Sequence, residues 1–165
     1  MSAVKRIKVK NRLAAVVRMP GGKTVVEAVA AAEEQLEAIK DGVIAALDVM
    51  LANLSEAAGR LKSDPSTEHI DVVYDLANDV VGVAGVVGLG SVGDAAYSLC
   101  ELLDSFIETK AWNWAAVEVH LNGLKLLRAM SEKMTEEQRE QVLDGLRAVV
   151  RRMGPATEAA PEAGA

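Results

Sequence analysis

Residues 88–93 carry glycines in the order of a dinucleotide-binding loop. Gly88, Gly90 and Gly93 fit the pattern G-x-G-x-x-G, and a valine-rich run precedes them. Such a loop holds a pyrophosphate only within a strand–helix–strand unit, in which an acidic residue ends the second strand. Helical patterns follow Gly93, and no further strand is predicted. We therefore interpret these glycines as the turn between two helices and expect no nucleotide cofactor.

Few other side chains have the types and spacing needed for catalysis or metal binding. The two histidines, His69 and His120, fall in different predicted helices, and neither has further ligands at a metal-binding spacing. Glu118 is two residues from His120, whereas di-iron bundles use a Glu-x-x-His pair. Cys100 lies among leucines, so we expect a buried structural thiol. We predict no metal and no cofactor, a capping or solvated His69, and a partly buried His120.

The composition indicates one acidic, soluble, intracellular domain. The 165 residues carry a net charge of −6, and half of them are hydrophobic but only 3% aromatic. A chain of this length can bury one substantial core, which Ala, Val and Leu must fill. The acidic balance argues against a nucleic-acid partner, and a single cysteine fits a reducing cytoplasm. We expect neither a membrane span nor a secretory signal.

The two ends of the chain differ from the middle. Residues 1–22 are basic and end in the breaker cluster Pro20-Gly21-Gly22. We expect a flexible arm there, with contact to an acidic partner as the alternative. Residues 154–165 are small and polar, which is typical of a disordered tail. The predicted helical domain therefore covers residues 23–153.

Apolar residues recur at spacings of three and four through this domain, which predicts helices. The expected segments are 24–61, 67–87, 92–109, 112–133 and 135–153. Asp41-Gly42 is expected to bend or split the first segment. Ser66 or Thr67 is positioned to cap the second, and Thr135 with Gln138 resembles a capping box. We predict an all-α fold, a four-helix up-and-down bundle with an additional N-terminal helical segment.

The segment 67–87 has two stripes at helical spacing. The apolar stripe comprises Ile70, Val73, Ala77, Val80, Ala84 and Val87. The second stripe comprises Asp71, Asp75, Asn78, Gly82 and Gly85. A strand would alternate every two residues instead. The segment is therefore predicted to be a helix with one buried and one exposed face.

Residues 74–88 resemble the active-site helix of histidine phosphotransfer domains, and residues 98–103 resemble the next helix in an alphaproteobacterial version of that family. The family pattern is alanine, histidine, aspartate, a hydrophobic residue, lysine and glycine, with a second glycine six positions on. The matching residues are Ala77, Asp79, Val80, Gly82 and Gly88. The resemblance covers about residues 25–150, although its specific motif covers only some thirty. It implies a four-helix bundle and a part in two-component signalling.

The sequence departs from the family at the reactive positions. Asn78 stands where the family has its phosphorylated histidine, and Val81 stands where it has a lysine. The lone pair of an amide nitrogen is delocalised into the carbonyl, so Asn78 cannot attack a phosphoryl group as an imidazole does. Without the lysine, no nearby cation offsets the phosphoryl charge. We therefore expect no phosphoryl transfer at this site and no enzymatic activity.

The resemblance implies a docking surface for a receiver domain or a histidine-kinase domain. Its expected residues are Asp71, Asp75, Asn78, Asp79, Val81, Gly82 and Gly85. Glycines permit close backbone approach, but Gly82 and Gly85 fit tight packing inside the bundle equally well. Two functional alternatives remain. One is an active phosphotransferase that uses a displaced histidine, His120 or less plausibly His69. The other is a structural or oligomeric helical module.

Overall fold

The structure, a computed structural model, describes residues 24–154, and this range is all-helical without strands. The elements are α2 (Val25–Leu61), α3 (Thr67–Ala84), the 3-10 turn η1 (Gly85–Val87), α4 (Gly90–Thr109), α5 (Trp114–Ala129) and α6 (Glu136–Met153). The predicted all-α class is confirmed. The basic arm 1–22 lies outside the described residues, as does the predicted tail beyond Gly154.

Two units follow each other along the chain, one ending at Ile39 and the other beginning at Lys40. The described part of the first unit is the start of α2, which begins with a capping box. The Thr24 backbone N–H donates to Glu27 Oε2 at 2.7 Å, and the Glu27 N–H donates to Thr24 Oγ1 at 3.2 Å. No break interrupts α2 at Asp41-Gly42. One interior glycine costs a helix only about 1 kcal/mol, which its alanine- and leucine-rich flanks can offset.

By length and composition alone, α2 is apolar enough to cross a membrane, with a mean hydropathy of 1.3 in its best window. The expected absence of any membrane span is therefore not supported for this helix. A core helix of a soluble protein meets the same criterion. The C-terminal part of α2 does supply core residues, among them Leu47, Leu54 and Leu61, which are fully buried.

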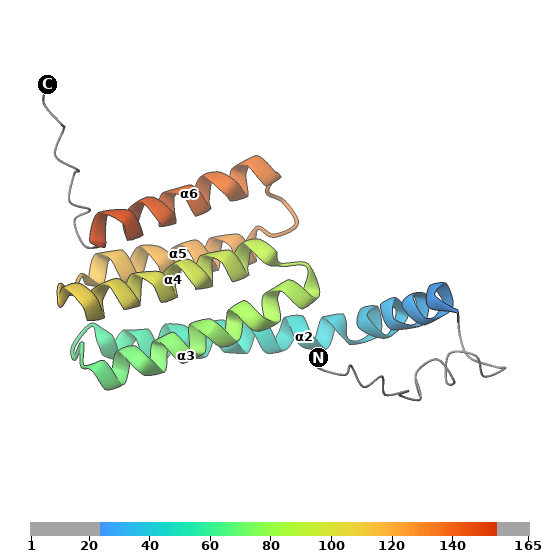
Figure 1. Cartoon of the computed structure of the whole chain (residues 1–165), viewed down its shortest axis with the longest axis horizontal. Helices are drawn as coiled ribbons and strands as arrows, with labels where there is room; N and C mark the ends of the chain where they lie inside the picture. The colour runs from blue at the N-terminus through green and yellow to red at the C-terminus, as the bar shows by residue number, and fades with distance from the viewer. Residues whose placement is uncertain (1–23, 155–165) are drawn as a thin grey trace, which may run out of the picture. The chain divides into compact units, whose positions relative to one another are not determined.

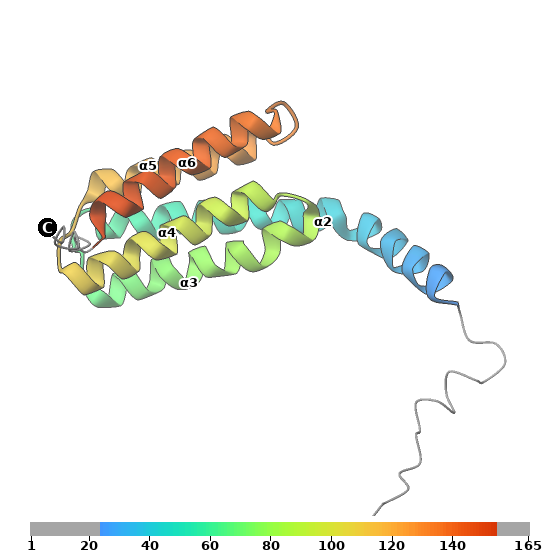
Figure 2. The same ribbon diagram turned by 45° about the horizontal axis from the view of Figure 1, so that its top comes forward.

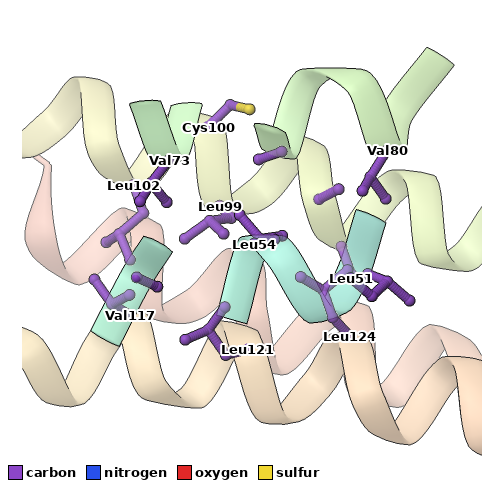
Figure 3. Packing of buried hydrophobic residues seen from close by; sticks show 14 of the residues in the cluster. Leu51, Leu54, Val73, Val80, Leu99, Cys100, Leu102, Val117, Leu121 and Leu124 are labelled. Carbon is purple, nitrogen blue, oxygen red and sulfur yellow. The ribbon is translucent and has the colours of Figure 1, made fainter. Parts of the chain in front are cut away.

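In the second unit α4 lies among α3, α5 and α6 and contacts all three (Figures 1 and 2). Ten of its twenty residues are buried. Side chains from α2, α3 and α5 converge on the α4 leucines Leu99 and Leu102 (Figure 3). Small residues let the helices approach closely, and Gly93 lies where a Cβ would meet Ala84 Cβ at 3.5 Å. Burial of α4 therefore organises this unit.

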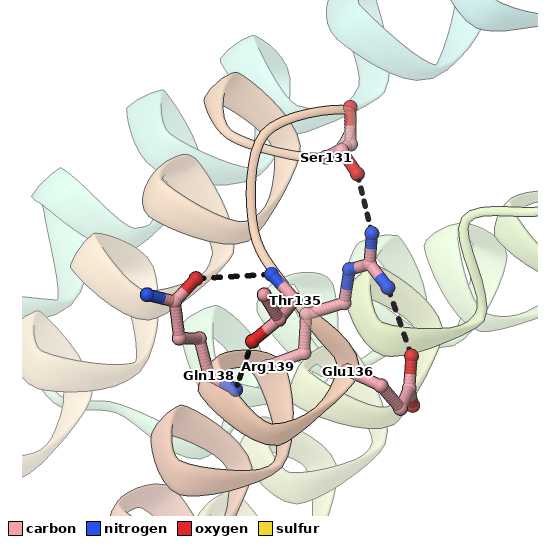
Figure 4. Close-up of polar contacts among 5 residues, drawn as sticks. All are labelled: Ser131, Thr135, Glu136, Gln138 and Arg139. Atoms are coloured by element: carbon pink, nitrogen blue, oxygen red, sulfur yellow. Dashed lines mark hydrogen bonds and ion pairs between the residues drawn. The ribbon is translucent and has the colours of Figure 1, made fainter.

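Polar contacts fix the ends and edges of the helices. The Arg128 guanidinium of α5 donates to both carboxylate oxygens of Asp48 on α2, at 2.7 and 2.8 Å. The predicted capping box of α6 is confirmed, since Thr135 and Gln138 exchange hydrogen bonds of 2.9 and 3.3 Å (Figure 4). Arg139 then donates to the Ser131 carbonyl at 2.7 Å, which ties α6 to the preceding loop.

The glycines that resembled a nucleotide loop form the turn between α3 and α4. Gly88 has φ +76°, a left-handed conformation that favours glycine. The Leu89 N–H donates back to the Ala84 carbonyl at 2.9 Å, which satisfies the end of α3. Gly90 already begins α4. A helix precedes this loop where a dinucleotide site needs a strand, so the interpretation as a turn is confirmed.

The packing predicts the effect of truncating Leu54, which is fully buried on α2. We expect Leu54→Ala to lower the free energy of unfolding by about 2–5 kcal/mol, because it leaves a cavity among several helices. Urea unfolding followed by circular dichroism measures this change. Val49, which is 59% exposed on the same helix, provides the control. Val49→Ala should change the free energy by no more than about 0.5 kcal/mol, and equal effects would contradict the observed packing.

Candidate docking face on helix α3

The outward surface of α3 and η1 carries the residues that the sequence predicted for docking. We call this surface the α3 face: Asp71, Asp75, Asn78, Asp79, Val81, Gly82 and Gly85. All are exposed except Val81, which is half-buried and packs against the core. The opposite side of the helix, from Ile70 to Ala84, is buried against the rest of the unit. The two predicted stripes therefore face in opposite directions.

The glycines of the α3 face have no packing role within residues 24–154. A Cβ placed on Gly82 or on Gly85 would meet no atom within 4 Å. By contrast, a Cβ on Gly123 of α5 would come within 3.1 Å of Leu146 Cδ1 on α6. Gly123 is thus a glycine that permits close helix packing, and Gly82 and Gly85 are not. The packing explanation for these two residues finds no support in the described chain.

The α3 face belongs to a strongly acidic part of the chain. Residues 63–109 include no lysine or arginine. They carry nine carboxylates: Asp64, Glu68, Asp71, Asp75, Asp79, Asp94, Glu101, Asp104 and Glu108. The net charge of −6 is that of the whole chain, so it does not show how strongly the acidic residues are concentrated in this segment. Such a field attracts a partner with a basic surface and repels free phosphate.

Asn78 lies at the middle of the α3 face with its side chain exposed. Its side chain makes no hydrogen bond to any residue between 24 and 154. Asp75 and Asp79 are its acidic neighbours along the helix, and α3 and α4 supply no cation. A phosphoryl group here would therefore meet negative charge without a compensating one. The amide can only donate or accept hydrogen bonds.

Two exposed valines next to the α3 face were missed by the sequence analysis. Val72 is 44% exposed and Val86 58% exposed. Their spacing, with Asp79 midway between them, places both on one side of the helix beside the polar stripe. They add apolar area that half-buried Val81 provides only in part. The sequence shows that positions 72, 79 and 86 are seven residues apart. Only the exposed fractions of the side chains distinguish these valines from core residues.

His120, the alternative phosphoacceptor, is fully buried in α5 and bonded at both ring nitrogens. Nδ1 lies 2.9 Å from the Ala116 carbonyl, and Nε2 lies 3.1 Å from Ser98 Oγ. The carbonyl can only accept, so Nδ1 carries the proton and Nε2 accepts the Ser98 hydroxyl hydrogen. Burial lowers the pKa of His120. Ser98 also lines a groove of about 400 Å³ between α4 and α6, but its hydroxyl is committed to the imidazole.

The remaining candidate side chains have structural positions. His69 Nδ1 lies 3.0 Å from the Asp64 carbonyl and 3.1 Å from Ser66 Oγ, so it braces the turn before α3. Ser66 is the N-cap residue, but its side chain contacts His69 and not a backbone N–H of the helix. Burial raises the pKa of the Cys100 thiol to about 11, which keeps it protonated and unreactive. No group of three potential metal ligands occurs between residues 24 and 154.

No family model, curated protein or solved structure matches this chain.

The open space at Gly82 gives a stability prediction. We expect Gly82→Ala to raise the free energy of unfolding by about 0.5–1 kcal/mol, because alanine is the better helix former and meets no neighbour. Gly88→Ala should lower it by about 1–2 kcal/mol, since φ is positive there. Thermal or urea unfolding of both variants tests this pair. Destabilisation by Gly82→Ala would show that Gly82 has a structural role.

The buried His120 gives a pH prediction. Its folded pKa lies below the unfolded value of 6.5, so below that pH the unfolded chain binds the proton more readily. The contribution of His120 to the free energy of unfolding is therefore fully present above pH 6.5. It decreases as the pH falls towards the folded pKa, by at most about 1.4 kcal/mol per pH unit. His120→Gln, which cannot titrate, should show a shallower fall between pH 7 and pH 5 in urea titrations. Identical slopes would contradict a buried neutral imidazole.

Proposed function

We propose that this protein is a non-catalytic relative of histidine phosphotransfer domains that binds a response-regulator receiver domain or a histidine-kinase domain. It would modulate two-component signalling by covering the partner's phosphoacceptor surface. The core would take the four-helix up-and-down arrangement of that family, with the start of α2 as the additional N-terminal segment. The proposed setting is the cytoplasm, without a cofactor.

The observation that carries the proposal is the pair of solvent-facing glycines on the α3 face. Gly82 and Gly85 lie one and two helical turns from Asn78, and no described residue uses the space above them. Gly82, in the interior of α3, costs helix stability that alanine would restore. A partner that must bring its backbone close to α3 supplies a reason to keep them. The flanking Val72 and Val86 supply apolar contact area for the same partner.

The absence of phosphoryl transfer rests on the chemistry of the α3 face. Asn78 offers no nucleophilic lone pair, and the neighbouring carboxylates oppose a transferred phosphoryl group. A partner could still place its own phosphoaspartate near the face if it carries the compensating cations. Binding of this kind would sequester the partner without accepting its phosphate.

Restoring the histidine and the lysine of the family pattern tests receiver binding and phosphoryl transfer together. We expect Asn78→His combined with Val81→Lys to accept phosphate from a receiver that the natural chain only binds, because position 78 is exposed and the surrounding surface is unchanged. The measurement uses a panel of purified receiver domains labelled with radioactive phosphate. The natural chain and Asn78→Ala should remain unlabelled while they co-elute with the same receiver.

A matched control introduces a histidine at a different exposed asparagine. Asn122 is also an exposed helical asparagine, on α5. Asn122→His should stay unlabelled, and adding Gly82→Leu to the restored variant should reduce labelling at least about tenfold by blocking close approach. Acid-labile label on the natural chain, or no receiver bound by it, would overturn the proposal.

The alternative of a displaced phosphoacceptor requires His120 to become accessible. Its full burial and two hydrogen bonds mean that α4 and α5 would have to separate first. Under this alternative, label would appear on the natural chain and be lost in His120→Ala.

The alternative of an oligomeric helical module is favoured by a different observation, the exposed apolar residues at the start of α2. Light scattering that finds a stable oligomer, together with no binding to any receiver or kinase domain, would support this alternative.

A further inference from the structure

The start of α2 exposes an apolar stripe. We call it the α2 stripe: Val25, Val29, Ala32, Leu36 and Ile39, whose spacings are 4, 3, 4 and 3. Val25 is 80% exposed, Leu36 48% and Ile39 54%. Spacings that alternate between three and four place these side chains on one side of the helix. This arrangement is typical of a helix that packs against another segment.

Two glutamates, Glu33 and Glu37, lie beside the stripe, whereas Glu34 and the capping residue Glu27 lie on the opposite side of the helix. Residues 24–39 contain Glu27, Glu33, Glu34 and Glu37 and no lysine or arginine. A segment that fits this surface needs apolar residues to cover the stripe and basic residues beside Glu33 and Glu37. Anionic lipid headgroups do not satisfy the second requirement. A second copy of the same helix would bring four more glutamates and no cation from this range.

Residues 4–19 of the same chain satisfy both requirements. They contain six basic residues and no acidic one: Lys5, Arg6, Lys8, Lys10, Arg12 and Arg18. Between them lie Ile7, Val9, Leu13, Val16 and Val17. This segment of sixteen residues is about as long as the segment 25–39, which has fifteen. Pro20-Gly21-Gly22 separates the two segments with residues that favour chain reversal, and short connections of this length join antiparallel segments.

We propose that the basic N-terminal segment, residues 4–19, binds the α2 stripe of its own chain. Its apolar side chains cover Val25 to Ile39, and its lysines and arginines lie on the edge of the stripe that carries Glu33 and Glu37. The connection is short, so binding within one chain has a high effective concentration and needs no second copy. This proposal is independent of the function assigned to the α3 face, because it concerns residues 4–39 alone.

Amide hydrogen exchange of the full chain, followed by mass spectrometry, tests this contact. Replacing Lys5, Arg6, Lys8, Lys10 and Arg12 by glutamate should speed exchange in residues 25–39 at least about tenfold. Residues 47–61, in the core, should be unaffected and report that the fold is intact. Exchanging lysine for arginine and arginine for lysine at the same five positions keeps the charge and should preserve protection. Adding Glu33→Lys, which lies beside the stripe, to the reversed variant should restore part of it, whereas adding Glu34→Lys, on the opposite side of the helix, should not.

Two results would support the proposal: protection of 25–39 that does not depend on protein concentration, and its loss and recovery in the charge variants. Protection that rises with concentration and survives reversal of the arm would assign the stripe to a second copy and overturn it. Protection that appears only with phosphatidylcholine–phosphatidylglycerol vesicles would assign the stripe to a membrane surface and also overturn it. Unchanged exchange in the reversed variant would show that the arm does not bind there.

Discussion

The burial of α4 on more than one side is the constraint on which the rest of the second unit depends. A helix packed by neighbours around most of its circumference must use small residues where a neighbouring backbone comes close, as at Gly93, where a Cβ would lie 3.7 Å from the Val81 carbonyl oxygen. Polar atoms on such a helix must be satisfied inside the core. Ser98 meets this requirement by donating to His120, which in turn donates to its own helix. The same requirement explains why the histidine is neutral and why it is unsuited to accepting phosphate.

Because α4 buries one side of α3, the other side is free to serve a partner. The inner stripe from Ile70 to Ala84 supplies the packing, so the outer residues contribute little to the core. Gly82, inside α3, lowers helix stability by about 1 kcal/mol relative to alanine, which is a considerable part of the stability of a small domain. A stable core makes this cost tolerable, and the proposed docking would give the smooth surface a use. The residues that stabilise the unit and the residues proposed for docking thus lie on opposite sides of one helix.

The helices could be predicted from the sequence because their determinants are local. Apolar spacing located all five α-helices, and the Thr135–Gln138 capping box followed from residue types three apart. Helix ends were less predictable: α5 begins at Trp114 and ends at Ala129, inside the predicted 112–133. Of the two residues predicted to cap α3, Ser66 and Thr67, Ser66 is the N-cap residue, yet its hydroxyl contacts His69, because competing side-chain partners are not visible in spacing. The Ser98–His120 pair joins residues 22 apart on different helices and required the fold. Whether Gly82 packs or faces solvent also depends on neighbours distant in sequence.

Apolar content, and not charge, distinguishes the two surfaces discussed above. The α3 face and the α2 stripe are both flanked by carboxylates, so electrostatic attraction alone would draw the basic N-terminal segment to either. Their side chains differ: the α2 stripe presents five apolar residues in register, whereas the α3 face presents glycines and an amide at its centre. The free energy gained by burying apolar side chains is roughly proportional to the apolar area covered. Glycine supplies almost no such area. An amphipathic basic segment therefore gains more on α2, whereas a partner whose own apolar residues reach a smooth helix gains more on α3. This difference leaves the α3 face open to another protein even though its own chain contains a basic segment.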